Sequence, residues 1–208
     1  MVPVSVEKLG AGEVARHIAR SAARLFSSQG YDATSVREIV EAAGVTKPTL
    51  YYHFGSKEGL AQALLKPLSK LGETLQEIAR SEGDPIAILV RLFEAHFAFC
   101  REEPDRARFY YAIAFGPHAK GLSEQLMSCG CEHYAPIITA VERLAKTGAI
   151  VPERGDDMLF MCRALITSAV MEFLFKGIEL GPDLASRLVN DILRGFGEPG
   201  SIGRELRP

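Results

Sequence analysis

The sequence predicts an all-α protein, with an N-terminal three-helix helix-turn-helix domain and a larger C-terminal helical domain. From Glu13 onward, apolar residues recur at helical spacing almost throughout the chain. The breaks in that pattern fall at glycine and proline. No stretch of useful length alternates apolar and polar residues, as a strand would. The 208 residues are enough for a small domain joined to a larger one.

The charge of the chain is unevenly distributed. Hydrophobic residues make up 47% and charged residues 24%, the ordinary balance of a soluble globular protein. The net charge of −2 excludes a uniformly basic nucleic-acid-binding protein. Residues 14–57, however, hold six basic and three acidic residues. We therefore expect the chain to contact phosphates at this end only.

The sequence carries no targeting signal that we recognise. Its first residues lack a long apolar segment, and no uninterrupted apolar run reaches the ~18 residues that span a bilayer. We expect a cytoplasmic protein with reduced thiols, no membrane partner and no cofactor.

The first predicted helix starts at Glu13 and stops at Gly30. Its apolar stripe consists of Val14, Ile18, Ala22, Leu25 and Phe26. The opposite face holds three arginines, Arg16, Arg20 and Arg24. A solvated face is the favoured interpretation of these arginines, and a phosphate-facing ridge is the alternative.

Two short helices joined by a tight turn follow. Ser35 and Glu38 form a capping-box pattern at the start of the first. Gly44 allows the turn, and Thr46 caps a second helix from Lys47 to about His53. A longer helix starts at Ser56 and runs to about residue 80, and Pro67 predicts a kink or break within it.

The second short helix has the side chains that a recognition helix needs. Its first turn, at residues 47–49, would enter the major groove, where lysine and threonine donate hydrogen bonds and a proline ring packs on thymine. The hydroxyl and imidazole groups at residues 51–53 suit phosphate oxygens. Ser35 and Lys57 each open a helix, an end that favours an anion.

The order of these parts resembles the TetR family of transcriptional regulators. The resemblance rests on residues 33–39 and on the run from Ala43 to Leu60, and it covers about residues 13–65. It implies a homodimer that acts as a repressor, released from a palindromic operator by a small effector. By position it implies DNA contacts at Ser35, Val36, Lys47, Pro48, Thr49, Tyr51, Tyr52, His53 and Lys57.

The predicted domains then take these bounds: an N-terminal arm over 1–12, the helix-turn-helix domain over 13–55, a connecting helix over 56–80, an effector-binding and dimerisation domain over 81–197, and a tail over 198–208. In the C-terminal domain, helices are predicted at about 85–101, 105–115, 120–146, 156–180 and 183–196.

The C-terminal domain has no motif as specific as the helix-turn-helix. Aromatic and methionine side chains favour an apolar or aromatic effector. Candidate pocket residues are His96, Tyr110, Met127, Tyr134, Met161, Arg163 and Glu172. By resemblance, the last two helices form a dimer bundle whose candidate seam is Leu184, Leu188, Ile192 and Phe196; the competing interpretation places these residues in the core of their own chain.

Cys129, Cys131 and His133 raise the alternative of a metal or redox site. Their helical positions do not converge unless Gly130 unwinds the helix, so buried thiols are favoured and no metal is expected. An enzyme is not expected, since the sequence has no phosphate loop or catalytic motif. A helical partner-binding module remains the other alternative.

Overall fold

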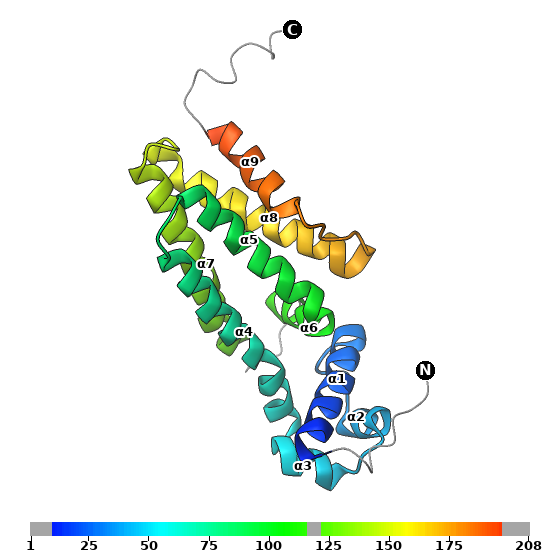
Figure 1. Cartoon of the computed structure of the whole chain (residues 1–208). Coiled ribbons are helices and arrows are strands. Elements are labelled where there is room, and N and C mark those ends of the chain that lie inside the picture. Colours follow the sequence, from blue (N-terminus) through cyan, green and yellow to red (C-terminus); the bar gives the residue numbers. More distant parts are fainter. Residues whose placement is uncertain (1–9, 116–121, 197–208) are drawn as a thin grey trace. The chain divides into compact units, whose positions relative to one another are not determined.

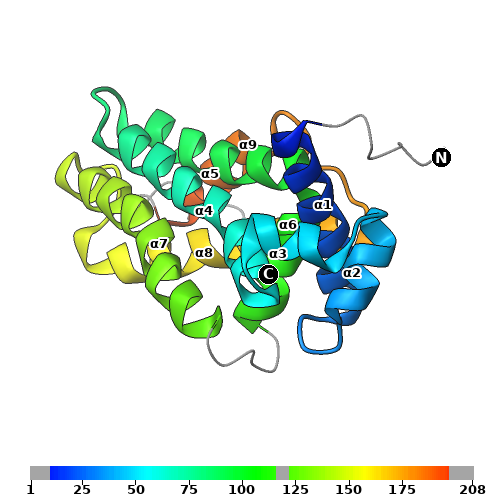
Figure 2. The same cartoon turned by 90° about the horizontal axis from the view of Figure 1, so that it is seen from below.

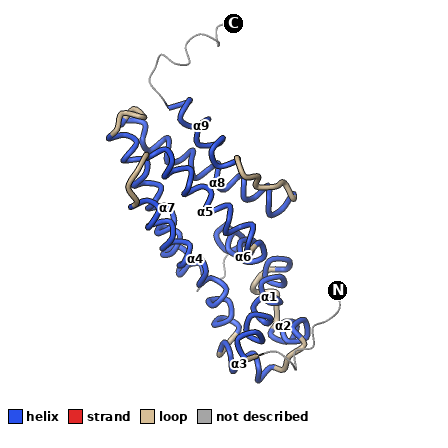
Figure 3. Tube along the Cα trace, in the orientation of Figure 1, coloured by secondary structure: helices blue, strands red, loops and turns tan. Residues whose placement is uncertain are grey.

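Helices account for every regular element in the two ranges that the structure describes, residues 10–115 and 122–196. For residues 67, 69, 122–133 and 196 this computed structural model describes the backbone only. No strand occurs in either range, which confirms the predicted all-α class (Figure 3). The helices are α1 (Ala11–Gln29), α2 (Val36–Ala43), α3 (Lys47–Phe54), α4 (Lys57–Arg80), α5 (Pro85–Glu102), α6 (Pro104–Phe115), α7 (Leu122–Lys146), the short η2 (Pro152–Arg154), α8 (Gly155–Lys176) and α9 (Leu184–Phe196).

Two helix boundaries and the interior of α4 differ from the sequence-based expectation. α1 begins two residues before Glu13, because the Glu13 carboxylate reaches back to the Gly10 amide and forms the cap there. α8 ends at Lys176 rather than near residue 180, because Gly177 takes the left-handed conformation with φ 71°. α4 continues through Pro67, so the helix has no break there, and the alternative of a kink stays a prediction.

The first compact unit combines residues 1–69 with residues 103–128. Within its described part, α1 packs on α2, α3 and α6 (Figures 1 and 2). α6 therefore completes the core around the helix-turn-helix although it lies far away in sequence. The rings of Phe26 and Phe109 meet there, with centroids 5.0 Å apart. The large buried side chains of this first unit include Ile18, Phe26, Ile39, Leu50, Leu60, Leu64 and Phe109.

The second compact unit combines residues 70–102 with residues 129–208. α5, α8 and α9 pack on one another in pairs (Figure 1). The Arg101 guanidinium ties α5 to the segment after α8 by donating to the main-chain oxygen of Leu180 at 3.1 Å. Two thiols, Cys100 and Cys162, lie buried among these helices.

α8 is apolar and yet largely uncovered within one chain. By length and composition alone, residues 152–176 reach the threshold for a membrane span, with a mean hydropathy of 1.7 in the most apolar window, of which only 28% is buried. This segment is not an uninterrupted apolar run, since it contains the charged residues Arg163 and Glu172. On one side α8 exposes Phe160 and Phe175, which are 69% and 56% exposed.

Candidate DNA-binding surface

A hydrogen-bond network sets the start of α2. The Ser35 hydroxyl accepts from the Glu38 amide at 3.2 Å, and the Glu38 carboxylate accepts from the Ser35 amide at 2.7 Å. This confirms the predicted capping box. The Gln29 amide group, at the end of α1, donates to Glu38 at 3.1 Å and to the Thr34 hydroxyl at 3.2 Å. The end of α1 therefore holds the α2 N-terminus, whose free amides favour an anion.

The turn between α2 and α3 depends on Gly44. This residue has φ 61° and ψ 32°, a left-handed conformation that a side chain would strain. The Val45 amide closes the turn on the main-chain oxygen of Val40 at 3.0 Å. Thr46 then caps α3, with its hydroxyl 3.4 Å from the Thr49 amide. The first turn of α3 is therefore fixed by the glycine turn before it and by its own cap.

Most side chains of α3 are at least partly exposed. Leu50 is its only fully buried side chain. Lys47 and Pro48, in the first turn, are exposed, and Tyr52 is 83% exposed. Residues 47–57 contain no acidic side chain, so nothing along this stretch repels phosphate. A helix that enters the major groove needs accessible side chains in its first turns, and Lys47, Pro48 and Tyr52 meet that requirement.

The other predicted contact residues are less accessible. Val36 is half-buried, and the Thr49 hydroxyl lies 2.9 Å from that of Thr46. The half-buried His53 ring meets the Tyr52 ring edge-on at 5.1 Å. Tyr51 is 45% exposed. These side chains therefore flank the surface formed by Lys47, Pro48 and Tyr52.

Lys57 has a partner that the sequence does not show. Its ammonium nitrogen lies over the ring of Tyr31, 4.2 Å from the centroid. Burial lowers the pKa of Lys57 from its ordinary value, while the carboxylates of Asp32 and Glu38 act in the opposite direction. Sequence reasoning missed Tyr31 and Gln29, because no local pattern links either to a residue in another helix.

The predicted effector residues are distributed over several places. Arg163 of α8 is exposed and lies over the ring of Tyr134 of α7, 4.6 Å from its centroid. Glu172 forms an ion pair with Lys176 at 2.6 Å. Both of these charged side chains of α8 therefore have a partner. Met161 is 38% exposed.

Three other candidates lie elsewhere or are not described. His96 is buried on α5 with Nδ1 2.8 Å from the main-chain oxygen of Leu92, and Tyr110 of α6 packs edge-on against Tyr111. The side chain of Met127 lies outside the described residues, as do those of Cys129, Cys131 and His133. Among the side chains that are described, no three potential metal ligands gather.

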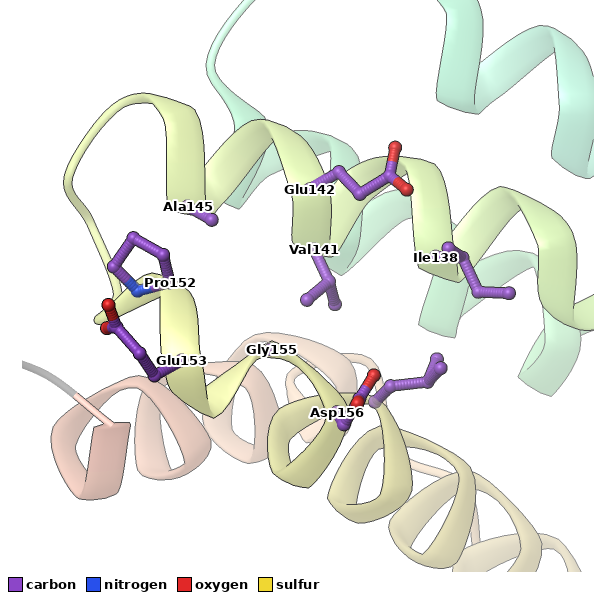
Figure 4. Close-up of a pocket in the computed structure, with 9 residues that line it drawn as sticks. Ile138, Val141, Glu142, Ala145, Pro152, Glu153, Gly155 and Asp156 are labelled. Atoms are coloured by element: carbon purple, nitrogen blue, oxygen red, sulfur yellow. The ribbon is translucent and has the colours of Figure 1, made fainter.

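A cleft of about 380 Å³ opens between α7, η2 and the start of α8 (Figure 4). Ile138 and Val141 of α7 lie on one side of it and Asp156 of α8 on the other. The full lining is Ile138, Val141, Glu142, Ala145, Pro152, Glu153, Gly155, Asp156 and Leu159. None of the predicted effector residues lines this cleft.

The residues of the predicted dimer seam differ in exposure. Ile192 is 3% exposed within a single chain, where α9 packs on α5 and α8, which favours the competing interpretation of this residue as part of its own core. Leu184 and Leu188 are half-buried and keep an outward side. The side chain of Phe196 lies outside the described residues.

Comparison with known proteins supports the helix-turn-helix assignment. The family model described as bacterial regulatory proteins, tetR family, matches residues 18–64. The HTH-type transcriptional regulator AcrR of Shigella flexneri is 42% identical over 110 residues, which are 52% of this chain and 51% of AcrR. The A-factor receptor protein of Streptomyces griseus is 35% identical over 165 residues, which are 79% of this chain and 53% of the receptor. The matches thus span about half the length of these two curated relatives.

The fold of this chain matches that of a solved regulator over most of its length. The crystal structure of the TetR-family regulator PfmR from Thermus thermophilus aligns with a TM-score of 0.65 and 26% identity, covering 87% of this chain and 99% of PfmR. Three findings point to the same family: the matched family model, the capped α2–turn–α3 geometry and this alignment. The chain belongs to the TetR family of bacterial regulatory proteins.

Proposed function

We propose that the protein is a dimeric transcriptional repressor whose α3 enters the major groove of a palindromic operator, and that a small apolar or aromatic effector releases it. One observation carries the DNA-binding part. The chain caps α3 firmly and buries only Leu50 of it, so that Lys47, Pro48 and Tyr52 project outward from a stretch without a carboxylate. DNA supplies groove edges for the lysine and the proline, and phosphate oxygens for the tyrosine hydroxyl.

The test is duplex binding by fluorescence anisotropy. The probe is a labelled duplex from the region upstream of the gene, and a scrambled duplex serves as the comparison. Affinity should fall steeply as salt rises, because each phosphate contact releases condensed counterions. The double variant Lys47→Ala/Tyr52→Ala should lose specific binding.

The matched control is Lys66→Ala. This lysine is exposed on α4, nine residues beyond Lys57, and its loss changes the charge equally. We expect it to retain specific binding. If the Lys47/Tyr52 variant bound the duplex as well as the wild type, this surface would not read DNA. A wild type without specific duplex binding would instead favour a partner-binding module.

The exposed face of α8 supports the dimer. Phe160, Phe175 and, just beyond the helix, Ile178 are each more than half exposed in the single chain. Apolar side chains gathered along one helix favour burial against a partner. A two-fold dimer would place this face of α8 against that of the second copy, with α9 beside it. The family resemblance supports the same pair of helices.

Analytical ultracentrifugation, by sedimentation, measures whether the protein is a dimer or a monomer. Phe160→Glu and Phe175→Glu should shift the protein from dimer to monomer and weaken DNA binding, because two linked recognition helices bind together more tightly than one. Phe115→Glu, at a phenylalanine of α6 that is 67% exposed, is the control and should leave the dimer intact. Flotation of the wild type with phospholipid vesicles, instead of dimerisation, would contradict this use of α8.

The effector class rests on the residues of the C-terminal helices and on a relative whose name describes it as a receptor. Thermal-shift measurements with aromatic compounds, fatty acids and sugar phosphates address it. Aromatic or apolar compounds should raise Tm and displace the labelled duplex, whereas sugar phosphates should do neither. Stabilisation by sugar phosphates alone would overturn the assignment.

A further inference from the structure

The ammonium group of Lys57 is held by an aromatic ring. Its Nζ atom lies 4.2 Å from the centroid of Tyr31, within the range of a cation–π contact. Lys57 is the first residue of α4, and Tyr31 lies in the turn after α1, 26 residues earlier. The contact therefore joins two segments that meet only in the folded domain.

The ring of Tyr31 is itself fixed from behind. Its centroid lies 5.2 Å from that of Phe26, and Phe26 is fully buried against Phe109 of α6. Such tilted ring pairs hold an aromatic side chain in one orientation. The Tyr31 ring is therefore packed on the core through Phe26 and contacts the Lys57 ammonium as well.

No described carboxylate forms an ion pair with Lys57. Asp32 and Glu38 attract it only through space, and Glu38 is already hydrogen-bonded to Ser35 and Gln29. Cation–π contact on one side leaves ammonium protons available on the other. A lysine in an ion pair would instead have to exchange a carboxylate for a phosphate.

We propose that Tyr31 is a positioning residue of the DNA-binding surface, whose ring holds the Lys57 ammonium at the start of α4 for a phosphate of the duplex. This rests on the proposed DNA-binding function and deepens it. The ring limits the rotamers of a long flexible side chain before DNA arrives, so less conformational entropy is lost on binding. Lys47, exposed in α3, has no such support.

The experiment is a double-mutant cycle on duplex affinity, with Tyr31→Leu, Lys57→Ala and their combination, each checked for folding by circular dichroism. Lys57→Ala should weaken binding and lower the salt slope by about one for each phosphate that the lysine neutralises. Tyr31→Leu should weaken binding about two- to fivefold in the wild type and not at all in the Lys57→Ala background. Tyr31→Phe keeps the ring and should bind as the wild type does.

A role of Tyr31 in packing alone predicts a different result. In that case Tyr31→Leu would weaken binding by the same factor with or without Lys57, and the proposal would be overturned. If Tyr31→Leu did not fold, progressively fluorinated phenylalanines at position 31 would keep the size of the ring while removing the negative charge of its face. Affinity should then fall step by step with fluorination, and a flat series would overturn the proposal.

Failure of the proposed function has its own signature. A wild-type protein that shows no salt-dependent duplex binding would refute the function and this inference together. If the wild type binds and Lys57→Ala changes neither affinity nor salt slope, only the inference fails.

Discussion

Gly59, in the first turn of α4, lies against the main-chain oxygen of Phe54 so closely that a β-carbon on Gly59 would overlap that oxygen. Phe54 is the last residue of α3, and the Ser56 hydroxyl accepts from the Gly59 amide at 2.9 Å. The close approach therefore sets how near the end of the recognition helix lies to the start of α4. Because the obstacle is backbone, it cannot move as a flexible side chain would.

Replacing Gly59 by Ala should therefore be destabilising, although alanine is the better helix former. Alanine normally stabilises an exposed helix by about 1 kcal/mol relative to glycine. Here the clash should reverse the sign and lower the free energy of unfolding by about 1–3 kcal/mol. Urea unfolding measures this, and Gly12→Ala in α1, with nothing within 4 Å of the added β-carbon, is the matched control. Equal stabilisation in both variants would refute the steric argument.

The elements that the sequence predicts correctly are those set by neighbouring residues. The Ser35–Glu38 capping box, the Gly44 turn and the Thr46 cap all depend on residues within a few positions, so their geometry follows from local chemistry. The exposed surface at Lys47–Tyr52 follows from helical periodicity. These parts form most of the candidate site.

The features that the sequence does not predict depend on tertiary contacts. Nothing near Phe109 shows that α6 packs on α1, and nothing near Tyr31 shows that it supports Lys57. Ile192 fits a dimer seam and its own core equally well by spacing, and only packing decides between them. Proline is usually unfavourable within a helix, yet α4 continues through Pro67, which local propensity alone does not predict.

Arg143 of α7 should be the side chain on which the junction after α4 depends. Its guanidinium donates to the main-chain oxygens of Ala79, Ser81 and Gly83 at 2.9–3.1 Å. Ala79 lies in the last turn of α4, where oxygens lack helical partners and a positive charge is favourable, and Ser81 and Gly83 lie in the segment that follows. Arg143→Ala should lower the free energy of unfolding by about 1–3 kcal/mol.

Arg143→Lys separates charge from geometry in the same assay. Lysine keeps the charge but cannot reach three carbonyls with a planar fork, so we expect most of the destabilisation to persist. Arg187→Ala, at an exposed arginine of α9, is the control and should change stability little. Full recovery with lysine would show that charge alone matters.

Glu38 should make the helix-turn-helix sensitive to acid. Hydrogen bonds from Ser35 and Gln29 lower the pKa of the Glu38 carboxyl from its ordinary value of 4.5. A carboxyl with a depressed folded pKa stabilises the native state above its unfolded pKa, and this contribution is lost as pH falls through the folded pKa. The stability difference between the wild type and Glu38→Gln should therefore shrink over that acidic range.

Removal of one hydrogen bond tests the cause of the shift. Gln29→Ala leaves the carboxyl in place but takes away a donor, so the folded pKa of Glu38 should rise toward 4.5. Carbon-detected NMR of the Glu38 carboxyl follows its titration in the wild type and in Gln29→Ala. An unchanged midpoint in Gln29→Ala would mean that the Ser35 cap alone produces the shift.

Cys100 and Cys162 should be chemically inert in the native protein. Burial raises the pKa of each thiol to about 12. Thiolate is the reactive form, and at neutral pH such a thiol is ionised only about once in 10⁵ molecules. In a Cys129→Ser/Cys131→Ser variant, Ellman's reagent should therefore react with neither remaining thiol until urea unfolds the protein. Ser28→Cys, at an exposed position of α1, should react at once in the same background. Rapid reaction without urea in the variant that lacks this added cysteine would mean that α5 or α8 opens locally, since burial is the largest cause of both raised pKa values.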